Sequence, residues 1–171
     1  PRNHSGKYTI EKLDSLLDCH ILEYWNVHFL QCDSIDIGGY LFIGATMWSN
    51  IDHDIDDPGL IRLTINDYRV IDGFTIKYGN RLHKKHIVYI KQQLKCYAQQ
   101  NNIPHIVITH HTPRRQDTGP PAYENSPHMA AFSTDISPEL LELTKYWICG
   151  HTHHKTVLPN VDNTGCTILL N

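Results

Sequence analysis

Histidine side chains that could bind a metal or transfer a proton gather in two short stretches of the last third of the chain. His110 and His111 are neighbours, and His151 and His153 flank a single threonine, in a sequence with 13 histidines among 171 residues. Imidazole titrates near neutral pH and binds zinc, iron, manganese and nickel alike. The spacing therefore predicts a metal site or a proton-transfer site and leaves the identity of the metal open.

Each histidine cluster directly follows a short apolar run. The runs cover residues 105–109 and 146–149, and runs of this length and composition are typical of strands buried on both faces of an α/β sheet. Loops beyond the ends of such strands are where α/β proteins build their sites. We therefore expect the two histidine clusters to meet along one edge of a sheet.

The residues around His151 allow two arrangements. Gly150 lacks a Cβ, so the backbone could turn sharply there and let His151 and His153 both point into a site. If the strand instead continues, Cys149, His151 and His153 lie on one face, because side chains alternate with a period of two. Such a face would form a mononuclear structural zinc site, which is an alternative from a different class.

Periodicity elsewhere predicts an α/β chain with helices outside the sheets. Apolar residues recur every three or four positions at 10–24 and 84–101, as in helices with one buried face. Serine, proline and glutamate at 137–139 are typical of the start of a short helix. The remaining predictions are a first helix ending near Asn26, strands at 27–32, 35–37 and 41–45 with a turn at Gly38-Gly39, loops at 49–59 and 114–127, a break at 78–81, and a closing hairpin of 156–158 with 166–170.

Composition limits the classes of protein to which the chain can belong. With 40% hydrophobic residues and a formal net charge of −3, it can bury one ordinary core, so we expect a single domain over residues 1–171. The charge gives no sign of nucleic-acid binding, and no apolar run approaches the roughly 20 residues that span a membrane. The start of the chain lacks the pattern of a signal peptide. We therefore expect a cytoplasmic protein whose five cysteines stay reduced.

Five segments, in this order along the chain, resemble the signature motifs of calcineurin-like metallophosphoesterases. They are residues 1–4 (PRNH), 41–48 (LFIGATMW), 66–69 (NDYR), 107–113 (VITHHTP) and 147–153 (WICGHTH). The GHTH run after a hydrophobic strand is fairly specific, and the upstream THHTP run strengthens it. The resemblance implies an α/β fold, the layered α-β-β-α sandwich with two central sheets, and hydrolysis of phosphomonoesters or phosphodiesters.

The resemblance also implies a centre of two divalent metal ions, which would be manganese, iron or zinc. In that assignment His151 and His153 bind different metals, and His110 binds the same metal as His151. Asn3 would complete the site of that shared metal. His111 could exchange roles with His110, and we prefer His110 because it directly follows the strand.

The catalytic acid implied by the resemblance is His4, which would stand near the leaving group and could give a proton near neutral pH. The implied reaction uses two cations about 3.5–4 Å apart that share a hydroxide and stabilise charge on a small phosphate-ester substrate. Arg114 and Arg115 follow the first histidine cluster and could contact phosphate, but we interpret them as solvated loop charges.

Two motifs of the family are absent from this sequence. Family members begin with Asp-x-His and Gly-Asp motifs, which give one metal most of its ligands and supply the aspartate that bridges both. This chain opens at the third motif, with Arg2 where glycine is usual and Ser5 where an acidic residue is usual. We therefore expect a domain that lacks the first strand-helix segment and whose site is completed by an N-terminal segment or a partner chain. The alternative is a catalytically silent scaffold that keeps the fold for binding.

Two polar segments receive structural interpretations. Residues 52–57 superficially suggest a calcium loop, but they lack the glycine at position six and the glutamate at position twelve. They are therefore predicted to form a solvated acidic loop. Residues 66–69 have no obvious chemistry of their own and are predicted to pack beside the site.

Overall fold

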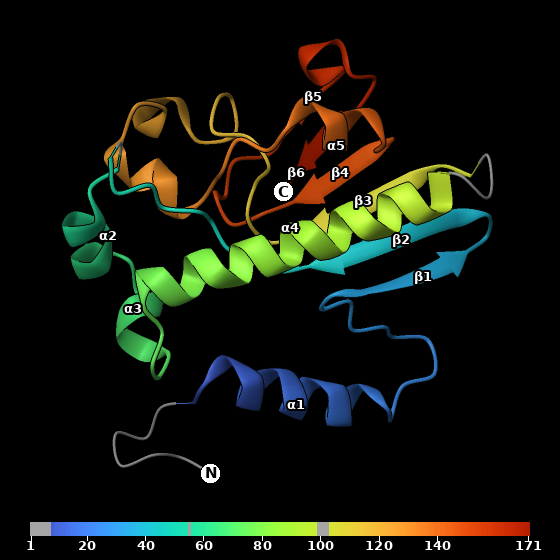
Figure 1. Cartoon of the computed structure of the whole chain (residues 1–171), viewed down its shortest axis with the longest axis horizontal. Helices are drawn as coiled ribbons and strands as arrows, with labels where there is room; N and C mark the ends of the chain where they lie inside the picture. The colour runs from blue at the N-terminus through green and yellow to red at the C-terminus, as the bar shows by residue number, and fades with distance from the viewer. Residues whose placement is uncertain (1–7, 55, 99–102) are drawn as a thin grey trace.

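The computed structural model describes residues 8–54, 56–98 and 103–171, which form a mixed α/β structure around one sheet of six strands (Figure 1). The strands are β1 (Asp33–Ile37), β2 (Tyr40–Ala45), β3 (His105–Thr109), β4 (Tyr146–Cys149), β5 (Thr156–Leu158) and β6 (Thr167–Leu170). The α-helices are α1 (Ile10–Ile21), α2 (Pro58–Thr64), α3 (Asp67–Val70), α4 (Ile76–Ala98) and α5 (Pro138–Glu142). Three short 3-10 helices are η1 (Pro121–Tyr123), η2 (Pro127–Ala131) and η3 (Val161–Asn163).

Parallel pairing of the central strands determines which loops can meet. The strand order is β1-β2-β3-β4-β6-β5, in which β2, β3, β4 and β6 run parallel while β1 and β5 are antiparallel at the two edges. In this register Ala45 lies beside Thr109, and Ile108 lies beside Ile148. The carboxyl ends of β2, β3 and β4 therefore share one edge of the sheet, so the predicted convergence of the strands that precede the histidines is confirmed.

Two helices, α4 and α5, cover one face of the sheet and enclose the main core (Figure 1). Alternate side chains of each strand point to this face. The best-buried members, each at most 1% exposed, are Leu41, Ile43, Met47, Ile90, Leu94, Val107, Leu140, Trp147, Cys166 and Ile168. Burial of this apolar surface, at about 25 cal/mol per Å², is the main force that holds the strands under α4.

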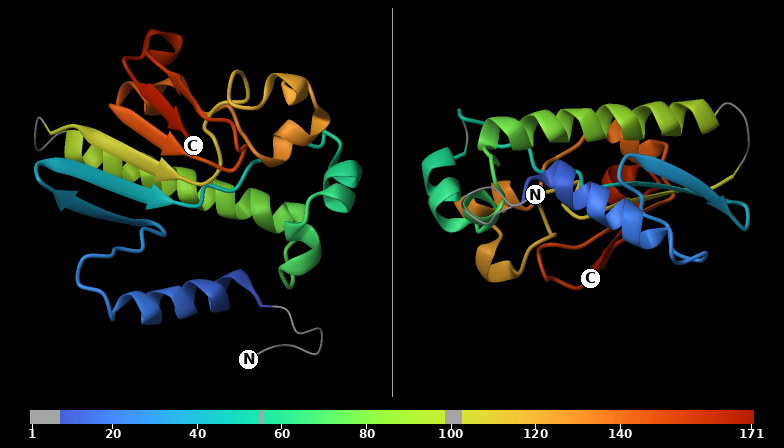
Figure 2. Two further views of the ribbon diagram at one scale, coloured as in Figure 1. Left: turned by 180° about the vertical axis from the view of Figure 1, so that it is seen from behind. Right: turned by 90° about the horizontal axis from the view of Figure 1, so that it is seen from below.

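The opposite face of the sheet carries apolar side chains but no helix of the described residues (Figure 2). Phe42, Ile108, Ile148 and Leu169 point to this side and are only half-buried. Stable α/β domains normally bury both faces of a largely parallel sheet. The described residues thus form one sheet with one covered face, and the second sheet of the expected sandwich is not seen among them.

Helix α1 forms where the sequence predicts a helix, but of its apolar face only Ile10 is buried. Thr9 caps it by accepting a hydrogen bond from the Lys12 backbone N–H, and the helix ends at Ile21, earlier than the predicted end near Asn26. Leu13 and Leu17 of the predicted buried face remain 38% and 46% exposed. The helix therefore lacks a packing partner on this side within the described part of the chain.

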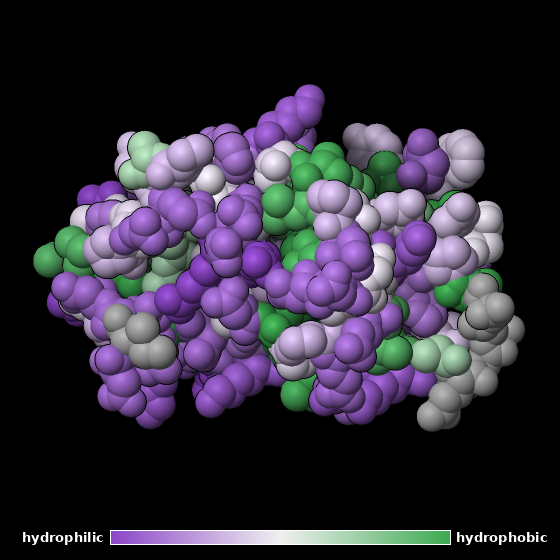
Figure 3. Space-filling model, turned by 90° about the horizontal axis from the view of Figure 1, so that it is seen from above, coloured by the Kyte–Doolittle hydropathy of each residue, from purple (hydrophilic) through white to green (hydrophobic). Residues whose placement is uncertain are grey.

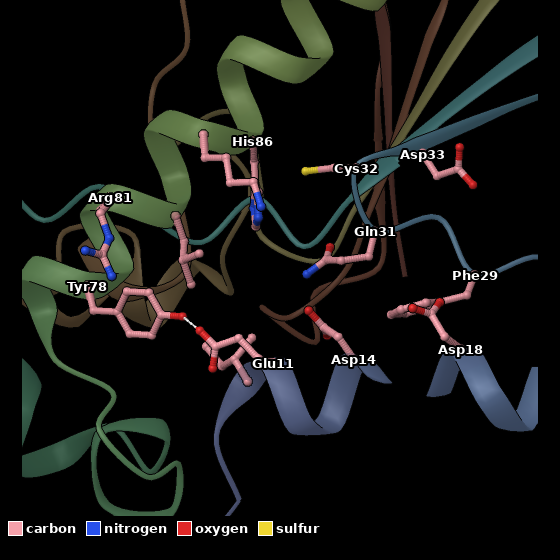
Figure 4. Close-up of a pocket in the computed structure, with 13 residues that line it drawn as sticks. Glu11, Asp14, Asp18, Phe29, Gln31, Cys32, Asp33, Tyr78, Arg81 and His86 are labelled. Carbon is pink, nitrogen blue, oxygen red and sulfur yellow. Dashed lines mark hydrogen bonds between the residues drawn. The ribbon is translucent and has the colours of Figure 1, made fainter. Parts of the chain in front are cut away.

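A cavity of 550 Å³ separates α1 from α4 and from the segment before β1 (Figure 4). Glu11 and Asp14 of α1 lie on one side of it, and Tyr78 and Arg81 of α4 lie on the other. Direct contact across the gap includes a hydrogen bond from the Tyr78 hydroxyl to the Glu11 carboxylate. The two helices are thus bridged by polar side chains rather than packed together.

The predicted strand at 27–32 is wrong, since these residues form no strand and β1 begins at Asp33. Its apolar composition fits a strand, but a strand needs a neighbouring chain to satisfy its backbone N–H and C=O groups. β1 pairs only with β2 among the described strands. The segment therefore has no partner there, although the turn at Gly38-Gly39 forms as predicted, with both φ angles positive.

Two predicted loop features are instead helical. The expected break at 78–81 lies inside α4, whose 23 residues begin at Ile76, because the Thr75 hydroxyl accepts a hydrogen bond from the Tyr78 backbone N–H and starts the helix earlier. Pro58 does not close a loop but begins α2, and Asp57 caps that helix through Leu60. The short helix after Ser137 and the closing hairpin of β5 with β6 are confirmed. The predicted end of the long helix, at residue 101, lies outside the described residues.

The face seen from above is mostly hydrophilic, with apolar side chains gathered in smaller patches (Figure 3). Among the described helices, none combines the length and the apolar composition that would let it cross a membrane.

Buried His86 should make the stability of the fold depend on pH. Its side chain is 2% exposed and its Nδ1 accepts a hydrogen bond from the Met47 backbone N–H, 3.1 Å away. Burial, with smaller effects of Lys85 and His83, lowers the pKa of His86 from 6.5 to about 4. Between these values the unfolded chain binds the proton that the folded chain excludes, so the free energy of unfolding should fall as pH drops from 6.5 to 4, by on the order of 3 kcal/mol.

Urea denaturation at several pH values checks this prediction in the wild type and in His86→Gln, which keeps an acceptor but does not titrate. The variant should show a shallower pH dependence, while His20→Gln, at an exposed histidine of α1, should keep the wild-type slope. Equal slopes in the wild type and His86→Gln would contradict the assignment.

Candidate functional site

Backbone hydrogen bonds tie together the loops that follow β2, β3 and β4. The Thr46 carbonyl accepts from the backbone N–H groups of His110 and His111, both at 3.2 Å. The His110 carbonyl in turn accepts from the Gly150 N–H at 3.1 Å. The two histidine-bearing loops are therefore fixed to each other and to the end of β2.

Three histidine rings lie side by side at this edge of the sheet. The ring centroid of His151 lies 4.5 Å from that of His110 and 4.3 Å from that of His111. The Nε2 atom of His151 is buried and has no hydrogen-bond partner among the described residues, and the same holds for Nε2 of His111. A buried nitrogen without a partner costs free energy unless a ligand or ion meets it.

The environment keeps these imidazoles neutral, which is the form that binds metals. Burial lowers the pKa of His151 to about 4, with further lowering by His110 and His153. Burial also lowers the pKa of His110. Asp67 raises that pKa in part, and His153 lowers it by a smaller amount. These mutual effects place His153 in the electrostatic neighbourhood of the other two, so the structure brings His110, His151 and His153 into one region.

The backbone turn that presents His151 and His153 differs from the predicted one. The two histidines themselves adopt left-handed φ angles of 67° and 53°, whereas Gly150 does not have a positive φ. A Cβ on Gly150 would meet only the Asn171 carbonyl oxygen at 3.5 Å, which is an ordinary contact. The prediction that Gly150 makes the turn is therefore wrong. Strained backbone at two histidines is typical of functional sites and costs about 1–3 kcal/mol at each residue.

His111 is held as a buried, oriented group behind the cluster. Its Nδ1 lies 2.8 Å from the Ser49 hydroxyl, and its ring packs against Trp48 at 5.2 Å. Burial moves its pKa well below 6.5. His110 is more exposed than His111, and His153 affects the pKa values of both His110 and His151. The choice between His110 and His111 as the ligand stays a prediction.

Asp67 is a candidate site residue that the sequence did not single out. Burial raises the pKa of its carboxyl group, and His110 lowers that pKa by a smaller amount. Its helix α3 is anchored by Tyr68, which stacks on Phe74 at 5.0 Å, and Phe74 in turn packs on Trp48 at 4.4 Å. Residues 66–69 thus pack beside the site as predicted, and they also bring a carboxylate towards it. The signal for Asp67 in the sequence is weak, because it consists only of a charged residue between a polar and an aromatic neighbour.

The described residues alone do not form a complete metal site. No group of three or more His, Cys, Asp or Glu side chains in residues 8–54, 56–98 and 103–171 is arranged to hold one ion. The predicted ligand Asn3 and the predicted acid His4 lie outside these ranges. His110 and His151 fit a metal as a pair, because both are largely neutral, their rings are adjacent and Nε2 of His151 lacks a partner.

The alternative zinc site of Cys149, His151 and His153 does not assemble. Cys149 points into the main core, and burial, followed by Cys166, raises the pKa of its thiol to about 12. Zinc binds the thiolate form of cysteine. A core thiol that resists ionisation is therefore a packing residue rather than a ligand.

The arginines and the acidic loop form ion pairs rather than a phosphate grip. Arg114 pairs with Asp162 at 2.6 Å, and Arg115 makes two hydrogen bonds to Asp56, at 2.9 and 3.1 Å. The side chain of Asp56 is only 4% exposed and also accepts from the Asp52 backbone N–H. The prediction of solvated charges is therefore wrong for Arg114, Arg115 and Asp56. The pair of Arg115 with Asp56 fastens the acidic loop to the loop after β3.

A cavity of 540 Å³ adjoins the histidines and is lined by His151, Thr152 and His153 together with residues of η1, η2 and the end of α2. The slightly larger cavity beside α1 lies elsewhere and contains none of the predicted site residues. We assign the candidate site to the smaller one, because chemistry follows the side chains that can perform it and not the size of the hollow.

Comparison with known proteins gives a fold and one sequence relative. No protein-family model matches the sequence. The chain is 32% identical over 161 residues to "Uncharacterized protein L509" of Acanthamoeba polyphaga mimivirus, an alignment that covers 85% of this chain and 55% of that protein. The chain therefore spans little more than half the length of this relative.

The structure is similar to the crystal structure of phosphopantetheinyl hydrolase (PptH) from Mycobacterium tuberculosis. The TM-score is 0.63 at 10% sequence identity, over 99% of this chain and 62% of that one. Similarity at this low identity shows a shared fold and carries no conclusion about activity. The chain thus has an α/β fold that is also found in a hydrolase.

Thr109 should support the first histidine loop through its hydroxyl group. The hydroxyl is buried, accepts a hydrogen bond from the Trp147 indole N–H at 2.9 Å and donates to the His111 carbonyl at 2.7 Å. Thr109→Val keeps the shape but leaves the indole N–H unpaired, so the free energy of unfolding should fall by about 1–3 kcal/mol.

Chemical denaturation measures this loss, and hydrogen exchange of the Trp147 indole N–H reports whether its partner is gone. Thr109→Ser is the matched control, because it keeps the hydroxyl group and should keep the indole N–H protected. Full stability together with a protected indole N–H in Thr109→Val would show that the hydroxyl has no supporting role.

Proposed function

We propose that this chain carries the histidine side of a dinuclear metal centre that hydrolyses phosphate esters. The observation that supports it most is the pairing of His110 and His151, whose ring centroids lie 4.5 Å apart at the carboxyl ends of two adjacent parallel strands. The unpartnered Nε2 of His151 and the hydrolase that shares the fold add to this support.

In this proposal the predicted residues keep distinct roles. His110 and His151 hold one metal ion and His153 holds the second, with Asn3 as a further ligand and His4 as the acid beside the leaving group. Asp67 acts on His110 electrostatically, and we assign it the role of orienting that imidazole so that one ring nitrogen turns to the metal. Two divalent cations, manganese, iron or zinc, would lower the pKa of bound water and neutralise the phosphate.

The proposed centre needs ligands beyond the described residues. A pair of histidines supplies two of the roughly four ligands that zinc-type sites use, and carboxylates normally add the charge that holds divalent cations. We propose that a further segment of the intact protein, or a partner chain, supplies them.

The open surfaces of the fold support a completing segment. Three features of the described residues leave room for such a segment: the uncovered sheet face with Phe42 and Ile148, and the exposed side of α1 with Leu13 and Leu17. The third is the stretch 27–32, which pairs with no strand. A second sheet packed between α1 and the observed sheet would bury the apolar surfaces and pair the segment. This arrangement is the α-β-β-α sandwich that the sequence resemblance implies.

Metal titration of the full-length protein, combined with an assay on bis-p-nitrophenyl phosphate, tests the proposal. The wild type should bind two equivalents of Mn²⁺ and hydrolyse the ester. His151→Ala and His153→Ala should each lower kcat/KM by roughly 100-fold, since loss of even a supporting residue costs metal affinity or activity by 10–100-fold. His53→Ala, at an exposed histidine of the 52–57 loop, is the control and should behave as wild type.

Other outcomes select the alternatives. One tightly bound zinc without turnover would favour a structural site. Absence of both metal and turnover in the full-length protein would favour the silent scaffold, a candidate supported by the incomplete ligand set of the described residues. Either result would overturn the enzymatic proposal.

A further inference from the structure

The surface of the cavity beside His151 and His153 is mostly apolar, and its polar lining residues are Thr64, Ser126, His128 and Thr152 besides the two histidines. The cavity measures 540 Å³, within the range of small-molecule sites. Its lining contains no lysine, arginine, aspartate or glutamate among the described residues. Apolar and aromatic side chains dominate instead, and the main ones are Ile65, Pro120, Tyr123, Met129 and Phe132.

The apolar wall continues directly from the histidines. The Phe132 ring packs on the His151 ring with centroids 4.6 Å apart. Tyr123, at the end of η1, is 60% exposed and offers its ring to the cavity from the rim. A molecule held at His151 and His153 would therefore have an aromatic surface beside it.

Packing around the cavity keeps this wall in place. The Thr64 hydroxyl lies 3.2 Å from Nδ1 of His128, which links the end of α2 to η2 across the cavity. Met129 is 6% exposed and packs close to Gly119, where a Cβ would lie 2.8 Å from the Met129 sulfur. The glycine thus leaves room for the thioether, and a methionine wall adapts to ligands of varied shape.

Among residues 8–54, 56–98 and 103–171, no cation that could hold additional phosphates lines this wall. Arg114 and Arg115 are paired with Asp162 and Asp56 and border a different hollow. Polynucleotides and polyphosphates need several basic contacts along their backbones. The lining therefore disfavours substrates with charge beyond the reacting phosphate.

We propose that this cavity binds the organic part of the substrate, and that this part is an uncharged, largely apolar group in which a planar ring fits best. The assignment rests on the proposed phosphoesterase function, because it places the reacting phosphate at the histidines. The ring would lie against Phe132, Met129 and Tyr123, where aromatic contacts and apolar burial favour it. Substrates would then be aryl-type phosphate esters rather than sugar phosphates or polyphosphates.

Binding of the bare alcohols tests the cavity without metal or hydrolysis. In NMR titrations of the full-length protein, 1-naphthol should shift the signals of Tyr123, Met129 and Phe132, while glycerol should not. Tyr123→Ala should weaken 1-naphthol binding by roughly fivefold, through loss of one aromatic contact. Tyr40→Ala is the matched control, because Tyr40 is 44% exposed at the amino end of β2, away from the histidines.

A second measurement separates this inference from the proposed function. The ratio of kcat/KM for 1-naphthyl phosphate over glycerol 3-phosphate should exceed ten in the wild type and fall roughly fivefold in Tyr123→Ala. Naphthol binding at Tyr123 without any hydrolysis would retain the cavity assignment and overturn only the enzymatic proposal. Hydrolysis with equal preference for both esters, or naphthol shifts confined to the cavity between α1 and α4, would overturn the cavity assignment.

Discussion

The parallel pairing of β2, β3 and β4 is the constraint on which the candidate site depends. It brings three strand ends to one edge, where the Thr46 carbonyl receives the backbone N–H groups of both His110 and His111. The Gly150 N–H then joins the second histidine loop to the first. Histidines some 40 positions apart in the sequence become neighbours through these few hydrogen bonds, and each bond depends on the strand register beneath it.

The candidate site gathers imidazoles that are held in the neutral form, which is the form that binds metals. Burial holds His111 and His151 neutral, and their Nε2 atoms have no partner among the described residues. Left-handed backbone at His151 and His153 adds strain that the surrounding fold must offset. A cation would make use of the neutral nitrogens, whereas an empty cluster leaves them as a net cost to stability.

Local patterns predicted the parts of the fold that depend on local physics. The strands before His110 and His151 were predictable, because short β-branched runs between loops have few other stable uses in an α/β chain. The prediction of a strand at 27–32 was wrong for the opposite reason, because a strand forms only beside a paired strand, and no local pattern shows whether one is present. The start of α4 was predicted too late along the chain. The Thr75 hydroxyl begins the helix despite Gly79, which lies in the predicted break at 78–81.

Within the site, sequence analysis identified the histidines but not the residues that orient them. Asp67 acts on His110 electrostatically from α3, and α3 is held in place by the ring contacts from Tyr68 to Phe74 and from Phe74 to Trp48. The nearly buried pairing of Asp56 with Arg115 likewise depends on two loops meeting in space. Such tertiary contacts leave little trace in a single sequence. The left-handed backbone at His151 is another example. The turn was predicted at Gly150, which lacks a Cβ, but the positive φ occurs at His151.

Anomalous X-ray diffraction from crystals of the full-length protein grown with Mn²⁺ would test the central claim most directly. The account predicts one anomalous peak bound by the imidazoles of His110 and His151 and a second peak bound by His153. Ordered rings at these three positions without any anomalous peak, with manganese absent or bound elsewhere, would contradict it.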